Sequence, residues 1–522
     1  GVSLVTALQN EPPSYSSDYT RDEMNYPVWH LGFPGGLIIA AVAVLHVFIS
    51  HFAVGGGAYL VLTERRAYSD DDSELLGYVR HHSRFFALLT VVLGAVTGVG
   101  IWFTIGLVSP EATSSLIHTF VWGWAIEWVF FFVEIAAALI YAYHWDTLDR
   151  QAHLVIGWIY FGAAWASLVV INGIITYMLT PGRWLETRSF GAGFFNPTYW
   201  PSLCIRTAMA VGLAGIFGLV TAMWEPSILR ERVVRWAGWW LVLGIASLLP
   251  LSRWYFHDLP SYSRAYFSGA YIGVRHSLRG AAVCAGVALI LTLVFALLRP
   301  KMMNPVVVAV LLVAGIGVMG SGEYLREFSR YPYVINSYIY ANDVRVGQME
   351  GITANGVAKT SPWVEVNAGN PHAYGRQLFA MECGSCHSVD GYRAMHRFAR
   401  GWDAKFASEI LLHLPVVRET MPPFAGDEHD RASLGSYLAS LAPATPSGAT
   451  EKELGQQVFA IHCALCHSVG GQRRPVDLKG IDPDGIAGML GTLGDINPDM
   501  PPFTGTGAEG HALAVYLSNP GK

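Results

Sequence analysis

Charged side chains are scarce in this chain, at 14% of its 522 residues against about 25% in an average soluble protein. Cysteine is also scarce, because only Cys204 and Cys284 lie outside the two motifs described below, too few for a disulfide framework. The net charge of −5 is small and spread thinly, which gives no reason to expect a nucleic acid partner. We also find no glycine-rich loop of the kind that cradles phosphate groups.

Apolar residues, in contrast, make up 52% of the chain, and the excess lies before residue 322. Eight segments there approach the roughly 20 apolar residues that a membrane-spanning helix needs. They are 36–62, 86–107, 119–143, 154–179, 207–226, 234–252, 279–298 and 304–320. The sequence therefore predicts an all-α protein whose residues 1–340 form a polytopic bundle with both ends on one side of the membrane.

Basic residues in the short loops predict the orientation. Arginines and one lysine lie between spans one and two, five and six, and seven and eight: Arg65, Arg66, Arg80, Arg84, Arg230, Arg232, Arg235, Arg299 and Lys301. These loops are expected in the cytoplasm and the C-terminus outside, across a bacterial inner membrane. Arginines in 180–206 and 253–279 do not follow this rule.

Two copies of the motif C-x-x-C-H follow the apolar region. They consist of Cys383, Cys386 and His387, and of Cys463, Cys466 and His467. This spacing lets two thiols bond covalently to one porphyrin while the histidine ligates the iron, so two covalent haem c groups are predicted. The covalent attachment also favours a periplasmic location for this part of the chain.

The same phrase, Met-Pro-Pro-Phe-x-Gly, begins at Met421 and at Met500, 34 and 33 residues after the motif histidines. A methionine thioether is the second iron ligand that raises the potential of a c-type haem. The alternative is that both methionines are ordinary core residues. Each repeat resembles a class I cytochrome c domain, and we expect these domains at 371–443 and 449–522. Residues 341–370 are predicted to be a linker, and 442–450 a connection between the two domains.

Ionisable residues inside apolar spans usually mark function. The candidates are His46 and His51 in the first span, Glu127 and Glu134 in the third, and Glu327 with Arg330 after the eighth. Taken singly, a buried histidine bonded to a carbonyl or a simple ion pair explains each of them. Glu127 and Glu134 are seven residues apart and share one helix face.

In combination, residues 30–340 resemble subunit I of the cytochrome bd oxidases. The stretches that carry the resemblance are Leu45-His46-Val47-Phe48 with Gly55, Leu93-Gly94 with Thr97-Gly98, Ala125-Ile126-Glu127 with Glu134, Asn172-Gly173, Asn196-Pro197, and Glu327 to Tyr333, which is similar to E-x-G-R-Q-P-W. The resemblance implies one or two non-covalent haems b or d. It places His46, Glu127 and Glu327 around them, Glu134 on a proton route, and Arg330 near the haem propionates.

The chain also departs from that family. Where the family has a histidine that binds the low-spin haem of the quinol side, this chain has Arg206 within 203–208, and an arginine does not ligate iron. The loop that forms the family's quinol site is short here, and the ninth span is replaced by the cytochrome pair. His51 and His276 are further candidate iron ligands.

These features predict a membrane-bound respiratory protein that passes electrons between periplasmic c-type haems and haem in the bundle. The leading hypothesis is a bd-like terminal oxidase that receives electrons from a periplasmic cytochrome c or another carrier and reduces oxygen. The alternative is an electron-transfer subunit that links quinone or a partner dehydrogenase to periplasmic cytochromes. A third possibility is that the bundle only anchors the cytochromes. The resemblance also implies a second membrane subunit.

Overall fold

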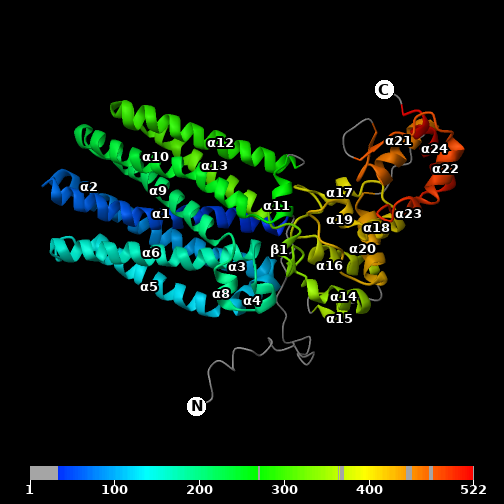
Figure 1. Cartoon of the computed structure of the whole chain (residues 1–522), viewed down its shortest axis with the longest axis horizontal. Coiled ribbons are helices and arrows are strands. Elements are labelled where there is room, and N and C mark those ends of the chain that lie inside the picture. The colour runs from blue at the N-terminus through cyan, green and yellow to red at the C-terminus, as the bar shows by residue number, and fades with distance from the viewer. Residues whose placement is uncertain are drawn as a thin grey trace, which may run out of the picture. The chain divides into compact units, whose positions relative to one another are not determined.

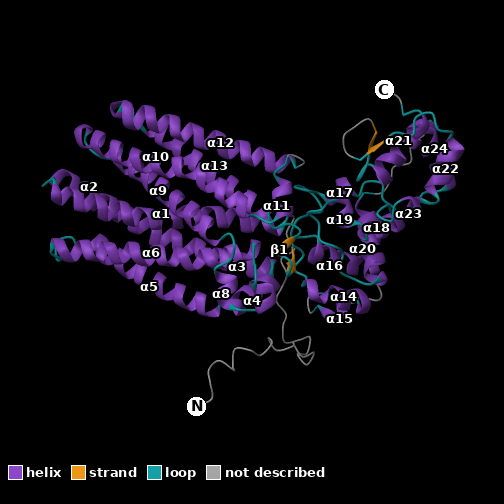
Figure 2. Ribbon diagram, viewed as in Figure 1, coloured by secondary structure: helices purple, strands orange, loops and turns teal. Residues whose placement is uncertain are grey.

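The computed structural model describes residues 33–268, 271–361, 364, 370–442, 450–469 and 474–520. Contacts divide the chain into two compact units (Figures 1 and 2). One is a helical bundle over Gly35–Val346, with which the short segment Glu419–Pro422 groups, and the other holds the remaining described residues. Helices dominate both units, which confirms the predicted all-α class.

Eight helices of the described chain are long and apolar enough to cross a membrane, as predicted. They are α1 (Gly35–Ser69), α2 with η3 and α3 (Ser73–Ala87, Leu88–Gly94 and Ala95–Val108), α5 (Val121–Tyr143), α6 (Arg150–Leu179), α9 (Tyr199–Ala222), α10 (Ser227–Asp258), α12 with η4 (Ile272–Leu291 and Thr292–Leu298), and α13 (Pro305–Phe328). Several run past the predicted apolar cores, and the fifth begins earlier than the predicted 207–226.

Short elements connect these helices. They are α4 (Pro110–Thr119), α7 (Trp184–Thr187), α8 (Phe190–Phe194), α11 (Ser261–Tyr266), η5 (Pro300–Met302), and the antiparallel strands β1 (Tyr333–Ile335) and β2 (Ile339–Tyr340). Asn196, in the turn after α8, holds this region to α6, because its amide donates to the oxygens of Thr176 and Gly193 at 2.9 and 3.0 Å. The loops near the predicted outer side are therefore folded tightly onto the bundle.

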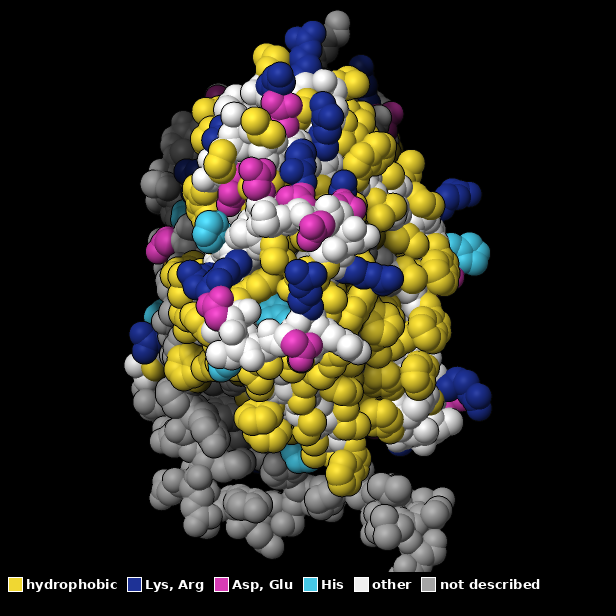
Figure 3. All heavy atoms as spheres, turned by 90° about the vertical axis from the view of Figure 1, so that its left-hand side faces the viewer, with side chains coloured by type: hydrophobic (Ala, Val, Ile, Leu, Met, Phe, Trp, Pro, Cys, Tyr) yellow, Lys and Arg dark blue, Asp and Glu magenta, His cyan; other side chains and the backbone are white. Residues whose placement is uncertain are grey.

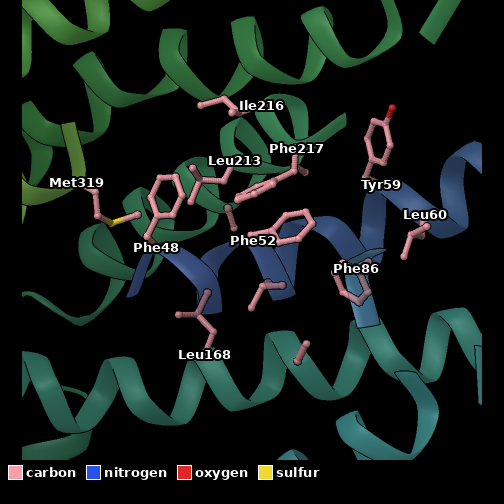
Figure 4. Close-up of a cluster of buried hydrophobic side chains, with 14 of the residues drawn as sticks. Phe48, Phe52, Tyr59, Leu60, Phe86, Leu168, Leu213, Ile216, Phe217 and Met319 are labelled. Atoms are coloured by element: carbon pink, nitrogen blue, oxygen red, sulfur yellow. The ribbon is translucent and has the colours of Figure 1, made fainter. Parts of the chain in front are cut away.

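Helix α1 lies in the core of the bundle and packs against α2, α6, α9 and α13. Aromatic rings fill this core (Figure 4), where Phe52 of α1 meets Phe217 of α9 with ring centroids 4.0 Å apart. The two helices come so close at Gly55 that a Cβ atom there would lie 1.9 Å from the Ala210 carbonyl oxygen. Glycine is required at this position because any side chain would collide with α9.

The flanks of the bundle expose large apolar side chains, including Trp128, Leu249 and Val306 at 66, 81 and 72%. Such exposure is expected where lipid is the surrounding solvent. Figure 3 looks onto the end that carries the loops between α1 and α2, α5 and α6, and α9 and α10. Basic and acidic side chains gather at this end, while apolar side chains cover the sides.

The second unit contains two similar helical arrays. The first consists of α16 (Pro371–Glu382), α17 (Met395–Phe398), α18 (Ala404–Leu411), α19 (Leu414–Val417) and α20 (Glu428–Leu441). The other consists of α21 (Glu451–Val458), η7 (Phe459–Cys463), β3 (Ser468–Val469), β4 (Pro475–Val476), α22 (Pro483–Leu490), α23 (Leu493–Ile496) and α24 (Gly507–Ser518).

The first and last helices of each array cross at a glycine. A Cβ atom on Gly375 would lie 2.2 Å from the Ser433 carbonyl oxygen, and one on Gly455 would lie 2.0 Å from that of Ala512. The two arrays thus share one packing solution, in agreement with the internal repeat found in the sequence.

The predicted linker 341–370 contains η6 (Val346–Gln348), α14 (Met349–Asn355) and α15 (Val357–Thr360). The amide of Val357 donates to the Asp430 carboxylate at 2.7 Å, which fixes α15 to the first array. The predicted connection 442–450 lies outside the described residues except at its two ends.

Candidate haem sites

Both C-x-x-C-H motifs form the same tight turn. The amides of Cys386 and His387 donate to the carbonyl of Cys383 at 3.1 and 2.8 Å. In the second motif the corresponding distances to the carbonyl of Cys463 are 3.0 and 2.8 Å. Each turn brings both thiols and the imidazole onto one short stretch of backbone, as attachment to a single porphyrin requires.

The motif histidines are held for iron ligation. Nδ1 of His387 lies 3.1 Å from the Arg393 carbonyl oxygen, and Nδ1 of His467 lies 3.0 Å from that of Arg474. A ring nitrogen that donates to a carbonyl fixes the tautomer and leaves Nε2 as the ligand atom. Burial also lowers the pKa of His387, which favours the neutral imidazole. These residues fit haem c, for which Cys383, Cys386, Cys463 and Cys466 would supply the thioether bonds.

Met421 and Met500 are both partly buried. After Met500, the ring of Phe503 packs 5.3 Å from the ring of His462, the residue before the second motif. The methionine phrase therefore lies next to the motif in the second array. The roles of both methionines as iron ligands stay predictions.

His46 lies on α1 and faces α3. Its Nδ1 lies 3.1 Å from the Thr97 hydroxyl, directly after the π-helical segment Leu88–Gly94. A Cβ atom on Gly98 would lie 3.2 Å from His46 Cε1, so the glycine leaves room beside the imidazole. An imidazole oriented at Nδ1 and open on one side fits a haem ligand.

His51 is 2% exposed and one helical turn deeper. Its Nδ1 donates to the Val47 carbonyl at 2.8 Å, whereas its Nε2 is buried without a hydrogen-bond partner. A buried nitrogen without a partner is costly, and iron ligation is one way to satisfy it. His51 therefore also fits a haem ligand, in addition to His46.

Arg206, at the position where the resemblance would place a histidine, is buried on α9. Its Nη2 lies 3.5 Å from Glu323 on α13, and Arg326 donates to the same carboxylate at 2.8 Å. Arg206 also interacts electrostatically with His51. The structure thus has an ion-pair cluster at this place.

Glu327 and Arg330 form an ion pair with each other at the end of α13. Arg330 is 5% exposed, and it also donates to the Val334 carbonyl at 2.8 Å. Its Nε has no partner, so one donor remains available to an anionic group such as a propionate. The ion pair uses one carboxylate oxygen of Glu327, Oε2.

Glu127 and Glu134 lie on one face of α5, which packs against α6. Ser167 donates to Glu127 at 3.0 Å, and the Tyr160 hydroxyl lies 3.1 Å from Glu134. Within the described chain, no hydrogen bond or ion pair joins these glutamates to His46, Glu327 or Arg330. The structure pairs Glu327 with Arg330 on α13, and it places His46 against α3 and both glutamates against α6. His276 is exposed on α12.

The sequence-based interpretation missed a buried polar cluster on α1, α5 and α6. Glu64 and His153 are 0 and 2% exposed, His153 Nδ1 lies 2.8 Å from Glu64 Oε1, and Tyr141 donates to Glu64 at 2.6 Å. The sequence contained one sign of this cluster, because Glu64 and His153 are ionisable residues at the edges of two predicted spans. Both lie just beyond the predicted ends 62 and 154.

The apolar bundle and the two motif-bearing arrays define a membrane-bound haem protein of electron transport. Residues 37–250 match the family model of cytochrome bd terminal oxidase subunit I, and residues 450–517 match that of cbb3-type cytochrome c oxidase subunit III. A search of curated proteins found no match. The bd oxidase from Geobacillus thermodenitrificans has a similar fold, with a TM-score of 0.50 at 15% identity, over 58% of this chain and 89% of that one. The chain thus joins a bd-like membrane domain to a cytochrome c domain, and this combination indicates respiratory electron transfer with haem as cofactor.

Proposed function

We propose that this protein is a terminal oxidase that receives electrons from a periplasmic cytochrome c and reduces oxygen to water. The observation that carries the proposal is the union, in one chain, of a bd-like bundle with two C-x-x-C-H arrays. Arg206 adds support, because the family's low-spin haem on the quinol side needs a histidine there and this chain has a buried ion pair. Electrons from quinol would thus be replaced by electrons from the cytochrome arrays.

The residues have distinct parts in this proposal. When bound, haem supplies electron transfer and the reduction of oxygen. His46 and Glu127 would hold haem in the bundle, with Glu327 as a further candidate, while Arg330 would neutralise propionate charge. His387 with Met421, and His467 with Met500, would hold the two covalent haems. Glu134 would hold the proton that each electron transfer requires.

The location follows from the loops. The end of the bundle with the loops between α1 and α2, α5 and α6, and α9 and α10, here called the loop-rich end, carries the basic residues (Figure 3). We therefore assign this end to the cytoplasm and both cytochrome arrays to the periplasm of a bacterial inner membrane. The apolar flanks of the bundle also offer surface to a second membrane subunit, which the bd family normally has. We therefore expect a heteromeric complex.

Oxygen uptake by the purified complex tests the proposal. Reduced cytochrome c should drive cyanide-sensitive uptake, and the double variant Cys463→Ser with Cys466→Ser should lose it. The control is Cys284→Ser, which removes a thiol outside the motifs and should leave the rate unchanged. Absence of uptake by the fully haem-loaded wild type would contradict the proposed function.

The unsatisfied Nε2 of His51 favours a second candidate, a pure electron relay with six-coordinate membrane haem. In that case His51 or His276 would supply the second ligand to a membrane haem iron, and no open coordination position would remain. Reduced protein would then give a wholly low-spin spectrum that carbon monoxide does not change. A haem that binds carbon monoxide favours the oxidase.

A further inference from the structure

A buried polar cluster joins three helices near the loop-rich end of the bundle. His153 of α6 contacts Glu64 of α1 at 2.8 Å through Nδ1, and its Nε2 lies 3.0 Å from the Tyr141 carbonyl of α5. The Tyr141 hydroxyl donates to the second oxygen of Glu64 at 2.6 Å. All three side chains are at most 4% exposed, so bulk water does not reach the cluster directly.

Structural stability alone explains this cluster poorly. A buried carboxylate and imidazole lose much hydration energy, and a well-packed apolar trio of the same volume would be at least as stable. Ionisable groups at membrane depth are therefore a functional signal, especially where they can exchange protons. Glu64 also has a route outward, because Tyr68, one turn further along the same helix, interacts with it electrostatically and is only partly buried.

A small cavity continues the cluster inward. It is lined by Tyr141 and Tyr160 together with Gly57, Leu60, Phe86, Ala138 and Gly157. About 10 Å³ of it is open to the centre of a water molecule, which is close to the space that one water needs. Glycine keeps this region open, because Cβ atoms on Gly57 and Gly157 would lie 2.5 and 2.9 Å from the rings of Tyr160 and Tyr141.

Tyr160 forms the far side of the cavity and meets Glu134. Its hydroxyl lies 3.1 Å from Glu134 Oε1 and 3.0 Å from the Ala53 carbonyl oxygen. Polar side chains thus follow one another from the partly exposed Tyr68 to Glu64, Tyr141, the cavity, Tyr160 and Glu134. The cavity separates Tyr141 from Tyr160 in this series and has room for about one water molecule.

We propose that Glu64, His153 and Tyr141 form the proton entrance of this protein and deliver protons through the cavity and Tyr160 to Glu134. The inference rests on the proposed function, because reducing one oxygen molecule to two waters takes four electrons and four protons. Protons enter from the loop-rich end, which we assign to the cytoplasm, and electrons come from the opposite side. Glu64 accepts a proton at its carboxylate and passes it to the Tyr141 hydroxyl oxygen, while the hydroxyl releases its own proton to water in the cavity.

A neighbouring polar cluster provides a matched control. Tyr59 and Tyr78 share a hydrogen bond of 3.0 Å between their hydroxyls, and Tyr78 contacts Thr221 at 3.1 Å. Tyr59 and Tyr78 are 0 and 1% exposed. Neither hydroxyl is bonded to a carboxylate, and the histidine of this cluster, His82, contacts the Thr221 hydroxyl at 2.8 Å. Tyr59→Phe and Tyr141→Phe each remove one buried hydroxyl, but Tyr59 lies outside the proposed entrance.

The test uses the full complex in liposomes, with reduced cytochrome c outside and a pH dye inside. Orientation is selected by adding the cytochrome only to the outer side. Glu64→Gln and Tyr141→Phe should lower oxygen uptake and internal proton consumption about tenfold and raise the solvent deuterium isotope effect, while their haem spectra stay unchanged. Tyr59→Phe should stay within twofold of wild type in all readouts.

The outcomes separate the two claims. No oxygen uptake by the wild type contradicts the proposed function itself. An active wild type together with unchanged proton consumption in Glu64→Gln contradicts the entrance alone. If Glu64→Gln fails to assemble its haems, Tyr141→Phe decides, because it leaves the contact between Glu64 and His153 in place. In that variant an unchanged rate and isotope effect would overturn the proposal.

Discussion

Arg206 of α9 and Glu323 of α13 form an ion pair inside the bundle, with 3.5 Å between Nη2 and Oε1 and side-chain exposures of 7 and 15%. Arg326 donates to the other oxygen of Glu323 at 2.8 Å, so the carboxylate lies between two guanidinium groups. The pair ties α9 to α13 at the place where the resemblance to bd oxidases would require a histidine. A position that serves haem binding in that family thus holds two helices together here.

Replacing Arg206 with leucine should lower the stability of the bundle by about 2–3 kcal/mol, less than the loss of an isolated buried pair because Arg326 stays beside Glu323. Thermal unfolding in detergent measures this change. As a control, Arg66→Leu breaks the exposed pair with Asp70 and should change stability by less than about 1 kcal/mol. If Arg206→Leu loses non-covalent haem without a change in stability, the arginine binds haem and does not mainly hold the two helices together.

If Met500 ligates iron as proposed, replacing it should change a redox potential. Met500→His should lower the midpoint potential of the second haem c by an amount on the order of 0.1 V or more, because nitrogen favours ferrous iron less than thioether sulfur does. A spectroelectrochemical titration would resolve this haem from the other. Met489→Leu, at an exposed position on α22, is the control and should leave the potential unchanged. An unshifted Met500→His would leave this methionine a core residue.

Asn196 should be important for stability. Its amide donates to Thr176 and Gly193, and its carbonyl oxygen accepts from Thr180 at 2.9 Å. Because Asn196→Ala would leave several buried polar groups without partners, we expect a loss of about 2–4 kcal/mol. Thermal unfolding would measure it against Asn304→Ala, which removes a helix cap from the loop at the other end of the bundle. Equal effects of the two variants would contradict this assignment.

The second cytochrome array begins with a capping box at Thr450 and Glu453. Thr450→Ala should lower the stability of this array by about 1 kcal/mol. The hydrogen bond from the Thr450 amide lowers the pKa of Glu453. A lowered acid pKa stabilises the fold above the ordinary value near 4.5 and ceases to do so as pH falls below it. Glu453→Gln should therefore flatten the acid side of the pH–stability curve, as followed by the haem absorbance of this array.

The number of spans and both haem c motifs could be predicted because each depends on local sequence. A run of about 20 apolar residues or a C-x-x-C-H motif carries its meaning alone. The ends of the helices could not be predicted, because the apolar segment is shorter than the hydrogen-bonded helix. Predicted span one stopped at residue 62, whereas α1 continues to Ser69. Glu64 was thereby assigned to a loop.

The pairing of side chains was the larger omission. Glu64 is 77 residues from Tyr141 and 89 from His153, and only the packing of α1 against α5 and α6 brings it to them. The same holds for Arg206, which looked like a simple loss of a ligand until its partner Glu323 was visible. His46 was identified from a motif, while its bond to Thr97 depends on how α3 packs.

The most direct test of the account measures haem in the purified wild type and in His46→Ala. Pyridine haemochrome analysis gives the ratio of non-covalent to covalent haem, and a carbon monoxide difference spectrum detects an open coordination position. We predict two covalent haems, at least one non-covalent haem that binds carbon monoxide, and loss of that signal in His46→Ala but not in the exposed-site control His257→Ala. A wild type with covalent haem alone would contradict the account.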